Sequence, residues 1–280
     1  MLLTSLHTHT NYCDGKYSAE DMVSAAIKCN MTSIGISTHG PTPFISDWNI
    51  KKENIDKYIN EINFLKEKYK NSIEIYLGME LDYIPDIGFD DTVKELIPKL
   101  DYYIGSLHYL GKFNSGVMWT VDYNIEELLQ GINESFDGDN RIAVETYYTY
   151  LGEMAEKFEP PIIGHLDLIK KNNKNNVLFD ENEDWYIKAV EGCLDIIKKT
   201  SSVIEINTGG IARGYVDEQY PSAFILKMIK NKNIPIIINS DAHTTDGLLC
   251  KYDEMFNLIN AYNFKKVSYL SKEGWKEQNL

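Results

Sequence analysis

Arginine and positive charge are scarce in this chain. Its 280 residues include two arginines, Arg141 and Arg213, and its 42 acidic residues outnumber its 28 basic ones. A formal net charge of -14 is the wrong sign for a surface that holds a polyphosphate backbone. We therefore expect no nucleic-acid partner.

Long apolar runs are also missing. No segment approaches the about 20 residues of a membrane-spanning helix, and the chain does not begin with the basic end and apolar stretch of a signal peptide. The four cysteines form no CxxC pair, so we expect reduced thiols rather than a disulfide framework. These absences predict a cytoplasmic protein without a membrane partner.

The remaining composition is typical of a globular protein, with 43% hydrophobic and 25% charged residues. No Pro-, Gly- or Ser-rich linker and no internal repeat divides the sequence. We therefore expect residues 1–280 to form a single domain. The sequence leaves the oligomeric state open.

Short runs of β-branched and aromatic residues alternate with longer helical patterns, which favours an α/β fold. The runs predict strands at Leu2–Leu6, Ser33–Ser37, Ile73–Gly78, Tyr102–Ser106, Pro161–Gly164, Val203–Asn207 and Pro235–Asn239. The patterns predict helices at Ser18–Cys29, Lys51–Tyr69, Asp90–Lys99, Ile142–Lys157, Glu183–Lys199, Ser222–Lys230 and Gly247–Tyr262. This alternation indicates parallel strands, in either an open doubly wound sheet or a closed barrel. The segment Tyr109–Asn124 is predicted to be an irregular connection that could serve as a lid.

The histidines point to one edge of this fold. All six stand at or just beyond the carboxyl end of a predicted strand, namely His7, His9, His39, His108, His165 and His243. Parallel α/β folds place their active sites at this edge, where the loops after the strands converge. One histidine in such a place is usually structural, but six together indicate a shared site.

Three acidic residues, Asp14, Glu80 and Asp241, occupy similar places. His7 and His9 are two residues apart, and so are Asp241 and His243. On a strand, side chains with this spacing share one face and lie about 6.6 Å apart. A catalytic zinc ion usually takes three protein ligands and a water, so nine donors suit two to three divalent ions. Nitrogen and oxygen donors without thiolate suit Zn, Mn or Fe.

The ordered set of motifs resembles the PHP (polymerase and histidinol phosphatase) superfamily, and within it the stand-alone histidinol-phosphate phosphatases. The matching stretches run from residue 5 to residue 244 and read SLHTHTNYCDGKYSAEDMVSAA, STHGPTPF, LGMELDY, IGSLHYL, IIGHLDLIKK, IEINTGGIARGY and NSDAHT. This resemblance implies a distorted (βα)7 TIM-like barrel with a trinuclear metal site.

The resemblance also implies a ligand set for each ion, with Glu80 bridging two of them. The implied sets are His7, His9, Glu80 and Asp241 for the first ion, Glu80, His108 and His165 for the second, and Asp14, His39 and His243 for the third. Relatives often carry an acidic residue directly before the histidine that corresponds to His39, where this chain has Thr38. We expect altered support of His39 rather than a lost ligand.

The activity implied by the resemblance is hydrolysis of a small phosphomonoester, in particular L-histidinol phosphate in histidine biosynthesis. Three divalent ions and three carboxylates leave a local charge of about +3, which favours a phosphate dianion. Coordination would lower the pKa of a water toward about 7, and the hydroxide would attack phosphorus. We expect Glu80, Asp241 and Arg213 to act in catalysis.

Cationic residues near the predicted site are candidates for binding phosphate. Arg213 follows two glycines after the sixth strand, and a guanidinium binds phosphate bidentately. Similar family members use an arginine there. Lys170 and Lys171 stand where relatives can carry another arginine, so either is a further candidate.

The leaving group is less clearly specified. An amino alcohol with an imidazole ring would need an acidic group and an aromatic wall, and Phe44, Trp119, Asp122 and the tyrosines near Tyr109 are available. Asp167 is a candidate supporting acid or proton donor, with a structural role equally open.

Other functions remain to be weighed at this point. A PHP-type phosphoesterase could act on another phosphorylated metabolite or a nucleotide, although the acidic composition argues against a nucleic-acid substrate. Amidohydrolases also begin with HxH, but they typically use a carboxylated lysine. A non-catalytic metal-binding module would take up metal without turnover.

Overall fold

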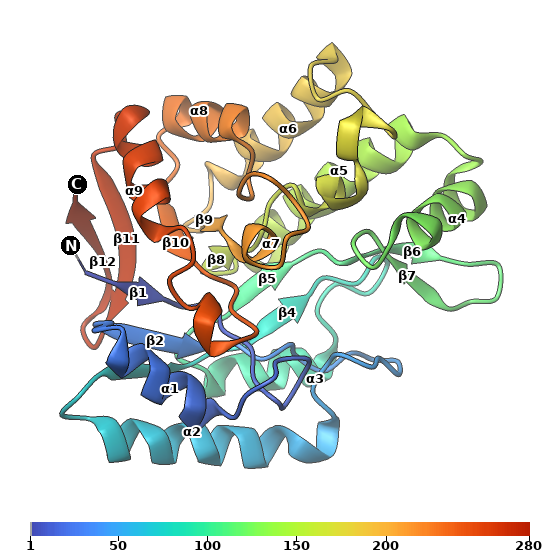
Figure 1. Ribbon diagram of the computed structural model, residues 1–280. Coiled ribbons are helices and arrows are strands. Elements are labelled where there is room, and N and C mark those ends of the chain that lie inside the picture. Colours follow the sequence, from blue (N-terminus) through green and yellow to red (C-terminus); the bar gives the residue numbers. More distant parts are fainter. Residues whose placement is uncertain (1) are drawn as a thin grey trace.

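The computed structural model describes residues 2–280 and shows parallel strands surrounded by helices (Figure 1). The strands are β1 (Thr4–Ser5), β2 (Ser33–Ile36), β3 (Glu74–Leu77), β4 (Glu80–Asp82), β5 (Ile104–Ser106), β6 (Tyr109–Lys112), β7 (Met118–Thr120), β8 (Ile162–Ile163), β9 (Val203–Asn207), β10 (Ile236–Asn239), β11 (Lys266–Ser271) and β12 (Gly274–Asn279). The α-helices are α1 (Ala19–Lys28), α2 (Ile55–Tyr69), α3 (Asp91–Leu96), α4 (Ile125–Phe136), α5 (Asn140–Phe158), α6 (Asp184–Ile197), α7 (Gly209–Ala212), α8 (Ala223–Lys232) and α9 (Tyr252–Ala261). Short 3-10 helices span Lys52–Asn54, Ile97–Lys99, Leu168–Asn172, Lys174–Asn176 and Thr245–Gly247.

Two parallel sheets make up the centre of the fold. One has the order β1-β2-β3 and the other the order β10-β9-β8-β5-β4. Single parallel bridges join them at Thr8 with Ala242 and at His39 with Glu80. β3 ends at Leu77 and β4 begins at Glu80, so the two count as one interrupted strand. The sheets then supply seven strands, which form an interrupted ring in agreement with the predicted distorted (βα)7 barrel.

The helices cover the outside of this ring, with α1 and α2 below the strands and α5, α6 and α8 above them in Figure 1. Helix α1 begins with a capping box, because Ser18 Oγ accepts a hydrogen bond from the Asp21 backbone N–H and the Asp21 carboxylate accepts one from the Ser18 backbone N–H. The main apolar core lies between strands and helices. Packing in this core holds the strands in place, and with them the starting points of the loops that follow the strands.

The inward faces of the strands change from apolar to polar along their length. In β9, Ile204 and Ile206 belong to the core under the helices, whereas Val203 belongs to a second, smaller buried cluster. Alternation puts Glu205 and Asn207 on the same face as Val203, farther toward the carboxyl end. This second cluster, which we call the apolar floor, contains Leu6, Tyr76, Tyr102, Ile104, Ile162, Val203, Ile237 and Leu270.

The segment Tyr109–Asn124 differs from its prediction. It holds the antiparallel hairpin β6–β7, whose turn is closed by hydrogen bonds between Phe113 and Val117 and between Gly116 and Phe113. Gly116 has a φ of 85°, which glycine adopts without strain, so this residue is suited to the turn. The predicted irregular connection is therefore wrong for this segment.

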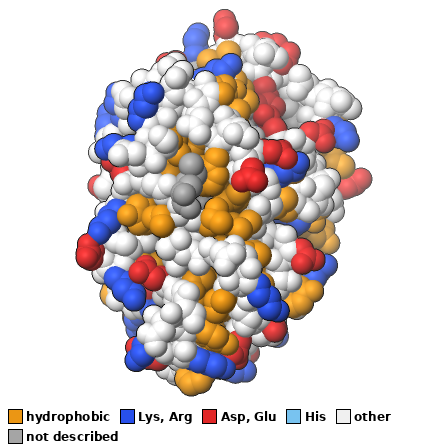
Figure 2. Space-filling model, turned by 60° about the vertical axis from the view of Figure 1, so that its left-hand side comes forward, with side chains coloured by type: hydrophobic (Ala, Val, Ile, Leu, Met, Phe, Trp, Pro, Cys, Tyr) orange, Lys and Arg blue, Asp and Glu red, His pale blue; other side chains and the backbone are white. Residues whose placement is uncertain are grey.

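Other elements were not predicted, namely helices α4 and α7 and the C-terminal hairpin β11–β12. The last helix begins at Tyr252, after a 3-10 turn, rather than at Gly247. Among residues 2–280, no helix is both long and apolar enough for a bilayer. Figure 2 shows the face with the C-terminal hairpin, where hydrophobic and charged side chains are interspersed and no histidine is visible.

Candidate metal centre

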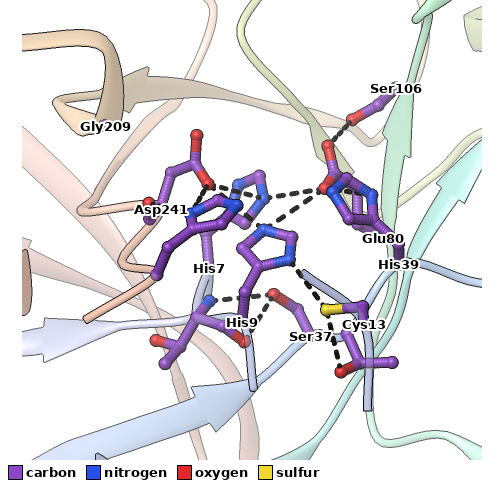
Figure 3. Close-up of polar contacts among 12 residues, drawn as sticks. His7, His9, Cys13, Ser37, His39, Glu80, Ser106, Gly209 and Asp241 are labelled. Carbon is purple, nitrogen blue, oxygen red and sulfur yellow. Dashed lines mark hydrogen bonds and ion pairs between the residues drawn. The ribbon is translucent and has the colours of Figure 1, made fainter. Parts of the chain in front are cut away.

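Glu80 lies at the centre of a group of imidazole rings. It begins β4, and its side chain is 1% exposed. Its Oε2 lies 3.1 Å from His7 Nε2, 3.4 Å from His9 Nε2 and 3.1 Å from His39 Nδ1. Its Oε1 lies 2.8 Å from His165 Nε2 and 3.7 Å from His108 Nε2. Figure 3 shows Glu80, His7, His9 and Asp241 pointing toward one another.

Asp241 and Asp14 complete the group on its other side. Asp241 Oδ1 lies 3.2 Å from His9 Nε2 and 3.6 Å from His7 Nε2. Asp14 Oδ2 lies 3.1 Å from His243 Nε2, and its Oδ1 lies 3.7 Å from His9 Nδ1. The structure thus brings all nine predicted ligands to one place, at the carboxyl ends of the parallel strands.

Three sets of these side chains have donor atoms close enough to hold an ion. The sets are His7, His9 and Asp241; His39, Glu80 and His108; and His9, Asp14, His39 and His243. They overlap with the three predicted sets, although His39 lies near Glu80 and His108 as well as near Asp14. The ion-by-ion assignment stays a prediction.

Buried atoms without hydrogen bonds test whether these residues fit metal ions. Within residues 2–280, no hydrogen bond is made by His7 Nε2, His9 Nε2, His39 Nδ1 or Glu80 Oε2. A buried polar atom normally has a partner, because leaving it unpaired costs about 1 to 3 kcal/mol. Atoms of this kind that face one another around a carboxylate are suited to divalent cations, so the residues fit the metal ions that the sequence predicts.

Two further carboxylates hold imidazoles from behind. Glu205 Oε1 lies 2.7 Å from His7 Nδ1, and Asp82 Oδ1 lies 2.6 Å from His108 Nδ1. Glu205 Oε2 also accepts a hydrogen bond from the His165 backbone N–H. Such contacts fix the orientation of a ring and leave its other nitrogen for a metal ion. Glu205 and Asp82 therefore orient predicted ligands.

Carboxylates and burial set the charge of the metal-free site. Burial lowers the pKa of His7 and of His108, but neighbouring carboxylates outweigh it, with Glu205 foremost at His7 and Asp82 at His108. The pKa of His7 is well above its usual value, and that of His108 is raised to about 10. Burial and the adjacent His243 and His39 lower the pKa of His9 to about 3.

The carboxylates of the group remain ionised. Burial alone would raise the pKa of Glu80, but His7, His39 and the other nearby imidazoles hold it well below its ordinary value. Burial likewise opposes ionisation of Asp241, and Arg213 and His7 outweigh it, so its pKa is also well below the ordinary value. The metal-free site thus holds protons on imidazoles that metal ions would displace.

Asp241 sits on an unusual backbone. Its φ is 48°, in the left-handed region that few non-glycine residues adopt. The α7 residue Gly209 packs against it, and a Cβ on Gly209 would lie 2.6 Å from Asp241 Oδ2. Asp241 therefore reaches the site because its neighbour has no side chain.

Thr38 lies where relatives often carry an acidic residue. Its Oγ1 lies 3.2 Å from Thr10 Oγ1 and 3.4 Å from Cys13 Sγ. Cys13 Sγ lies in turn 3.4 Å from His9 Nδ1 (Figure 3). Thr38 is thus linked to the ring of His9, and its predicted effect on His39 stays a prediction.

A cavity of about 660 Å³ opens over the metal-ligand group, and both Arg213 and Lys171 line it. Arg213 Nη2 lies 3.0 Å from Asp241 Oδ2, and its Nη1 lies 2.7 Å from His243 Nδ1. Lys170 does not line the cavity, since its buried ammonium pairs with Asp167 at 3.2 Å and with Glu218 at 2.9 Å. Of the two lysines, Lys171 is the one placed to meet a ligand.

The residues predicted to contact the leaving group also differ in whether they line the cavity. Asp122 lines the cavity, whereas Trp119 is fully buried and Phe44 packs against Tyr109 without lining it. Asp167 is fully buried and accepts a hydrogen bond from the Ser222 backbone N–H at 2.8 Å. Of these four residues, only Asp122 reaches the cavity.

Comparison with known proteins places this arrangement in a family. Residues 5–209 match the PHP domain. The chain belongs to the PHP domain family. Asp241 and His243 lie beyond the matched residues, yet they complete the same ligand group from the end of β10.

Relatives of this PHP protein align over nearly all of it. Histidinol-phosphatase of Bacillus subtilis is 28% identical over 266 residues, which are 88% of this chain and 96% of that protein. HisK of Listeria monocytogenes has a structure with a TM-score of 0.80 at 24% identity, covering 90% of this chain and 99% of that one. Histidinol phosphate phosphatase of Lactococcus lactis, solved with zinc, L-histidinol and phosphate, has a TM-score of 0.75 at 18% identity over 99% of this chain and 100% of that one. These structures share the fold.

Sequence reasoning missed Glu205 and Asp82 in this PHP site. A signal was present for Glu205, because VIEIN places one carboxylate between two isoleucines of a buried strand. A fully buried carboxylate needs a partner, so that pattern indicates a pairing with a site residue. Asp82 ends a strand that begins with Glu80, and it carries the same signal.

Proposed function

We propose that this protein is a metal-dependent phosphatase that hydrolyses L-histidinol phosphate to L-histidinol and phosphate in histidine biosynthesis. The observation that carries the proposal is the convergence of nine predicted metal ligands around Glu80, beside a cavity of about 660 Å³. The relatives supply the substrate, because the Bacillus subtilis protein is named histidinol-phosphatase and the Lactococcus lactis structure holds L-histidinol and phosphate.

Charge supports a phosphomonoester as the substrate. Bound divalent ions would supply positive charge for the phosphoryl oxygens and a water of lowered pKa. Glu80, Asp14 and Asp241 would balance only half of the charge of three such ions, so a dianion is attracted in spite of the net charge of -14. Distant surface charges act weakly, since the Debye length is about 8 Å at physiological ionic strength.

Glu80 and Asp241 position the reacting groups in this proposal. Glu80 directs its two oxygens to different sets of imidazoles, so it would be a ligand to more than one metal ion. Asp241 contacts His9 on one side and Arg213 on the other. It thereby ties the metal ligands to the guanidinium that is predicted to bind phosphate.

Arg213 and Lys171 are the cations proposed to bind the phosphoryl oxygens. Arg213 presents a planar set of donors beside the metal ligands, which suits bidentate binding of an oxyanion. Lys171 Nζ lies 4.4 Å from the centre of the Tyr215 ring, and the guanidinium carbon of Arg213 lies 5.6 Å from the same centre. Tyr215 thus holds the two cations on one wall of the cavity.

We further propose that residues 1–280 act as one domain in the cytoplasm, without a nucleic-acid or membrane partner. The free cysteines Cys13, Cys29, Cys193 and Cys250 support a reducing compartment. The acidic composition supports a small phosphorylated substrate over a nucleic acid.

A panel of phosphomonoesters tests the substrate. Protein loaded with Zn, Mn or Fe should hydrolyse L-histidinol phosphate with a kcat/KM at least about 10²-fold above that for glycerol phosphate, which corresponds to about 2.7 kcal/mol. A smaller preference would overturn the named substrate while leaving phosphatase activity in place. Metal uptake without release of phosphate from any ester would instead indicate a non-catalytic metal-binding protein.

A further inference from the structure

One wall of the cavity carries a carboxylate that no predicted metal ion requires. Four carboxylates line the cavity within residues 2–280, and three of them, Asp14, Glu80 and Asp241, are predicted metal ligands. The fourth is Asp122, whose side chain is 24% exposed. It is therefore both held in place and open to a ligand.

Asp122 is carried by a firmly anchored turn. The Val121 backbone N–H donates to the His108 carbonyl at 2.9 Å, and Thr120 donates through its backbone N–H and its hydroxyl to Glu127 at 2.8 and 3.0 Å. Asn124 caps helix α4 by accepting the Glu127 backbone N–H. The carboxylate thus lies on a turn that is hydrogen-bonded to the backbone of the predicted ligand His108, and this fixed place lowers the entropy lost on binding.

The partner of Asp122 leaves one of its oxygens available. Lys171 Nζ contacts Oδ2 at 3.1 Å, and Oδ1 accepts no hydrogen bond from residues 2–280. The pair forms a dipole along the cavity wall, negative at Asp122 and positive at Lys171. A ligand with an ammonium and a phosphate group would present the opposite charges to the two ends.

Aromatic side chains line the cavity beside this carboxylate. Tyr123 is 68% exposed and follows Asp122 in the chain. Trp48 lines the cavity while its ring stacks on Tyr109, with centroids 5.6 Å apart and planes at 15°. A ring fixed in this way loses little freedom when a planar group of the ligand packs against it.

We propose that Asp122 recognises the ammonium group of the leaving alcohol, with Trp48 and Tyr123 packing against its ring. The inference rests on the proposed function and adds to it a specificity-determining wall. Lys171 and Arg213 bind the phosphate of the substrate, and the free oxygen of Asp122 binds its ammonium group. A monoester without an ammonium group gains nothing from Asp122.

Substrate pairs that differ in the ammonium group test this assignment. Metal-loaded wild type, Asp122→Asn and Asp122→Glu are assayed with L-histidinol phosphate, phosphoethanolamine and glycerol phosphate. A hydrogen bond between charged groups implies that Asp122→Asn lowers kcat/KM for the two amines by about 10- to 100-fold, mainly through KM. Hydrolysis of glycerol phosphate should stay within about twofold, and Asp122→Glu should recover part of the loss.

Asp47→Asn is the matched control, because Asp47 is an exposed carboxylate on the nearby segment before Trp48 and does not line the cavity. It should leave all three substrates unchanged. An equal loss on glycerol phosphate and on the amines in Asp122→Asn would overturn the assignment, since Asp122 would then act through Lys171 on the phosphate. No change on any substrate would overturn it as well.

A binding measurement separates this inference from the proposed function. Calorimetry with L-histidinol and the metal-loaded protein, at saturating inorganic phosphate, should give a Kd at least about tenfold weaker for Asp122→Asn. The affinity for phosphate alone should not change. If wild type released no phosphate from any ester, the proposed function would fail, and an equal Kd in both proteins would contradict the role of Asp122 alone.

Discussion

The apolar floor and the metal-ligand group lie on the same strands, two residues apart. Val203 of β9 belongs to the floor and Glu205 supports His7, while Ile104 of β5 belongs to the floor and Ser106 donates a hydrogen bond to Glu80. The floor is buried, and its side chains make polar contacts only through two hydroxyls, those of Tyr102 and Tyr76, which donate to the Leu6 carbonyl and to Glu74. The metal-ligand group, which we call the rim, instead gathers carboxylates and imidazoles that need a cation. The comparison shows stability and chemistry divided along the length of each strand.

The largest effect is expected at the centre of the rim. Glu80→Gln removes the charge shared by five imidazoles, so kcat/KM should fall by about 10³-fold, or about 4 kcal/mol. Steady-state kinetics with saturating metal measure this loss. Glu67→Gln, on the exposed side of α2, is the control and should have wild-type activity. Activity within tenfold of wild type in Glu80→Gln would remove Glu80 from the mechanism.

The opposite behaviour is expected on the floor. Ile237 is 1% exposed, and Ile237→Ala should lower the free energy of unfolding by about 2 to 5 kcal/mol because it leaves a cavity. Activity per folded molecule should be retained. Urea denaturation at a fixed metal concentration gives the stability change. A variant that lost activity with unchanged stability would break the division between floor and rim.

A smaller effect is expected from the carboxylates behind the imidazoles. Glu205→Gln weakens the contact that orients His7, and metal affinity should fall by about 10- to 100-fold. Excess metal should restore most of the activity, which a missing catalytic group would not allow. Titration against a chelator measures the affinity, with Glu191→Gln on the exposed side of α6 as control.

The smallest effect concerns pH. In the metal-free protein the pKa of His7 is raised and that of His108 is raised to about 10, so both rings hold protons at neutral pH. Metal ions need the unprotonated nitrogen, so loading releases protons and affinity rises with pH, about tenfold per unit for each proton displaced. Apparent Kd values at pH 6, 7 and 8 give the slope. A slope of zero would show that these rings bind no proton that the metal displaces.

The ring of strands and the convergence of the nine predicted ligands could be predicted from the sequence because both depend on local patterns. Each strand is a short apolar run, and each histidine follows such a run directly, as in His165 after β8. Parallel strands bring these ends together whatever the details of packing. The match of residues 5–209 to the PHP domain agrees with the predicted fold.

Contacts between distant elements could not be predicted in this way. Glu205 and His7 are 198 residues apart, and the local sequence around either residue does not indicate that the two form a hydrogen bond. Lys170 and Lys171 are neighbours with different surroundings, since Lys170 turns to Asp167 and Glu218 while Lys171 reaches the cavity. Helix α4 was not predicted, although Asn124 and Glu127 form a capping pattern at its start.

The central claim is that side chains from distant strands hold several cations together around Glu80. Anomalous diffraction from crystals of metal-loaded protein tests it most directly. The account predicts two or three metal peaks, neighbouring peaks about 3.5 to 4 Å apart, with Glu80 between two of them. A single isolated peak in fully loaded crystals, or peaks away from Glu80, would contradict it.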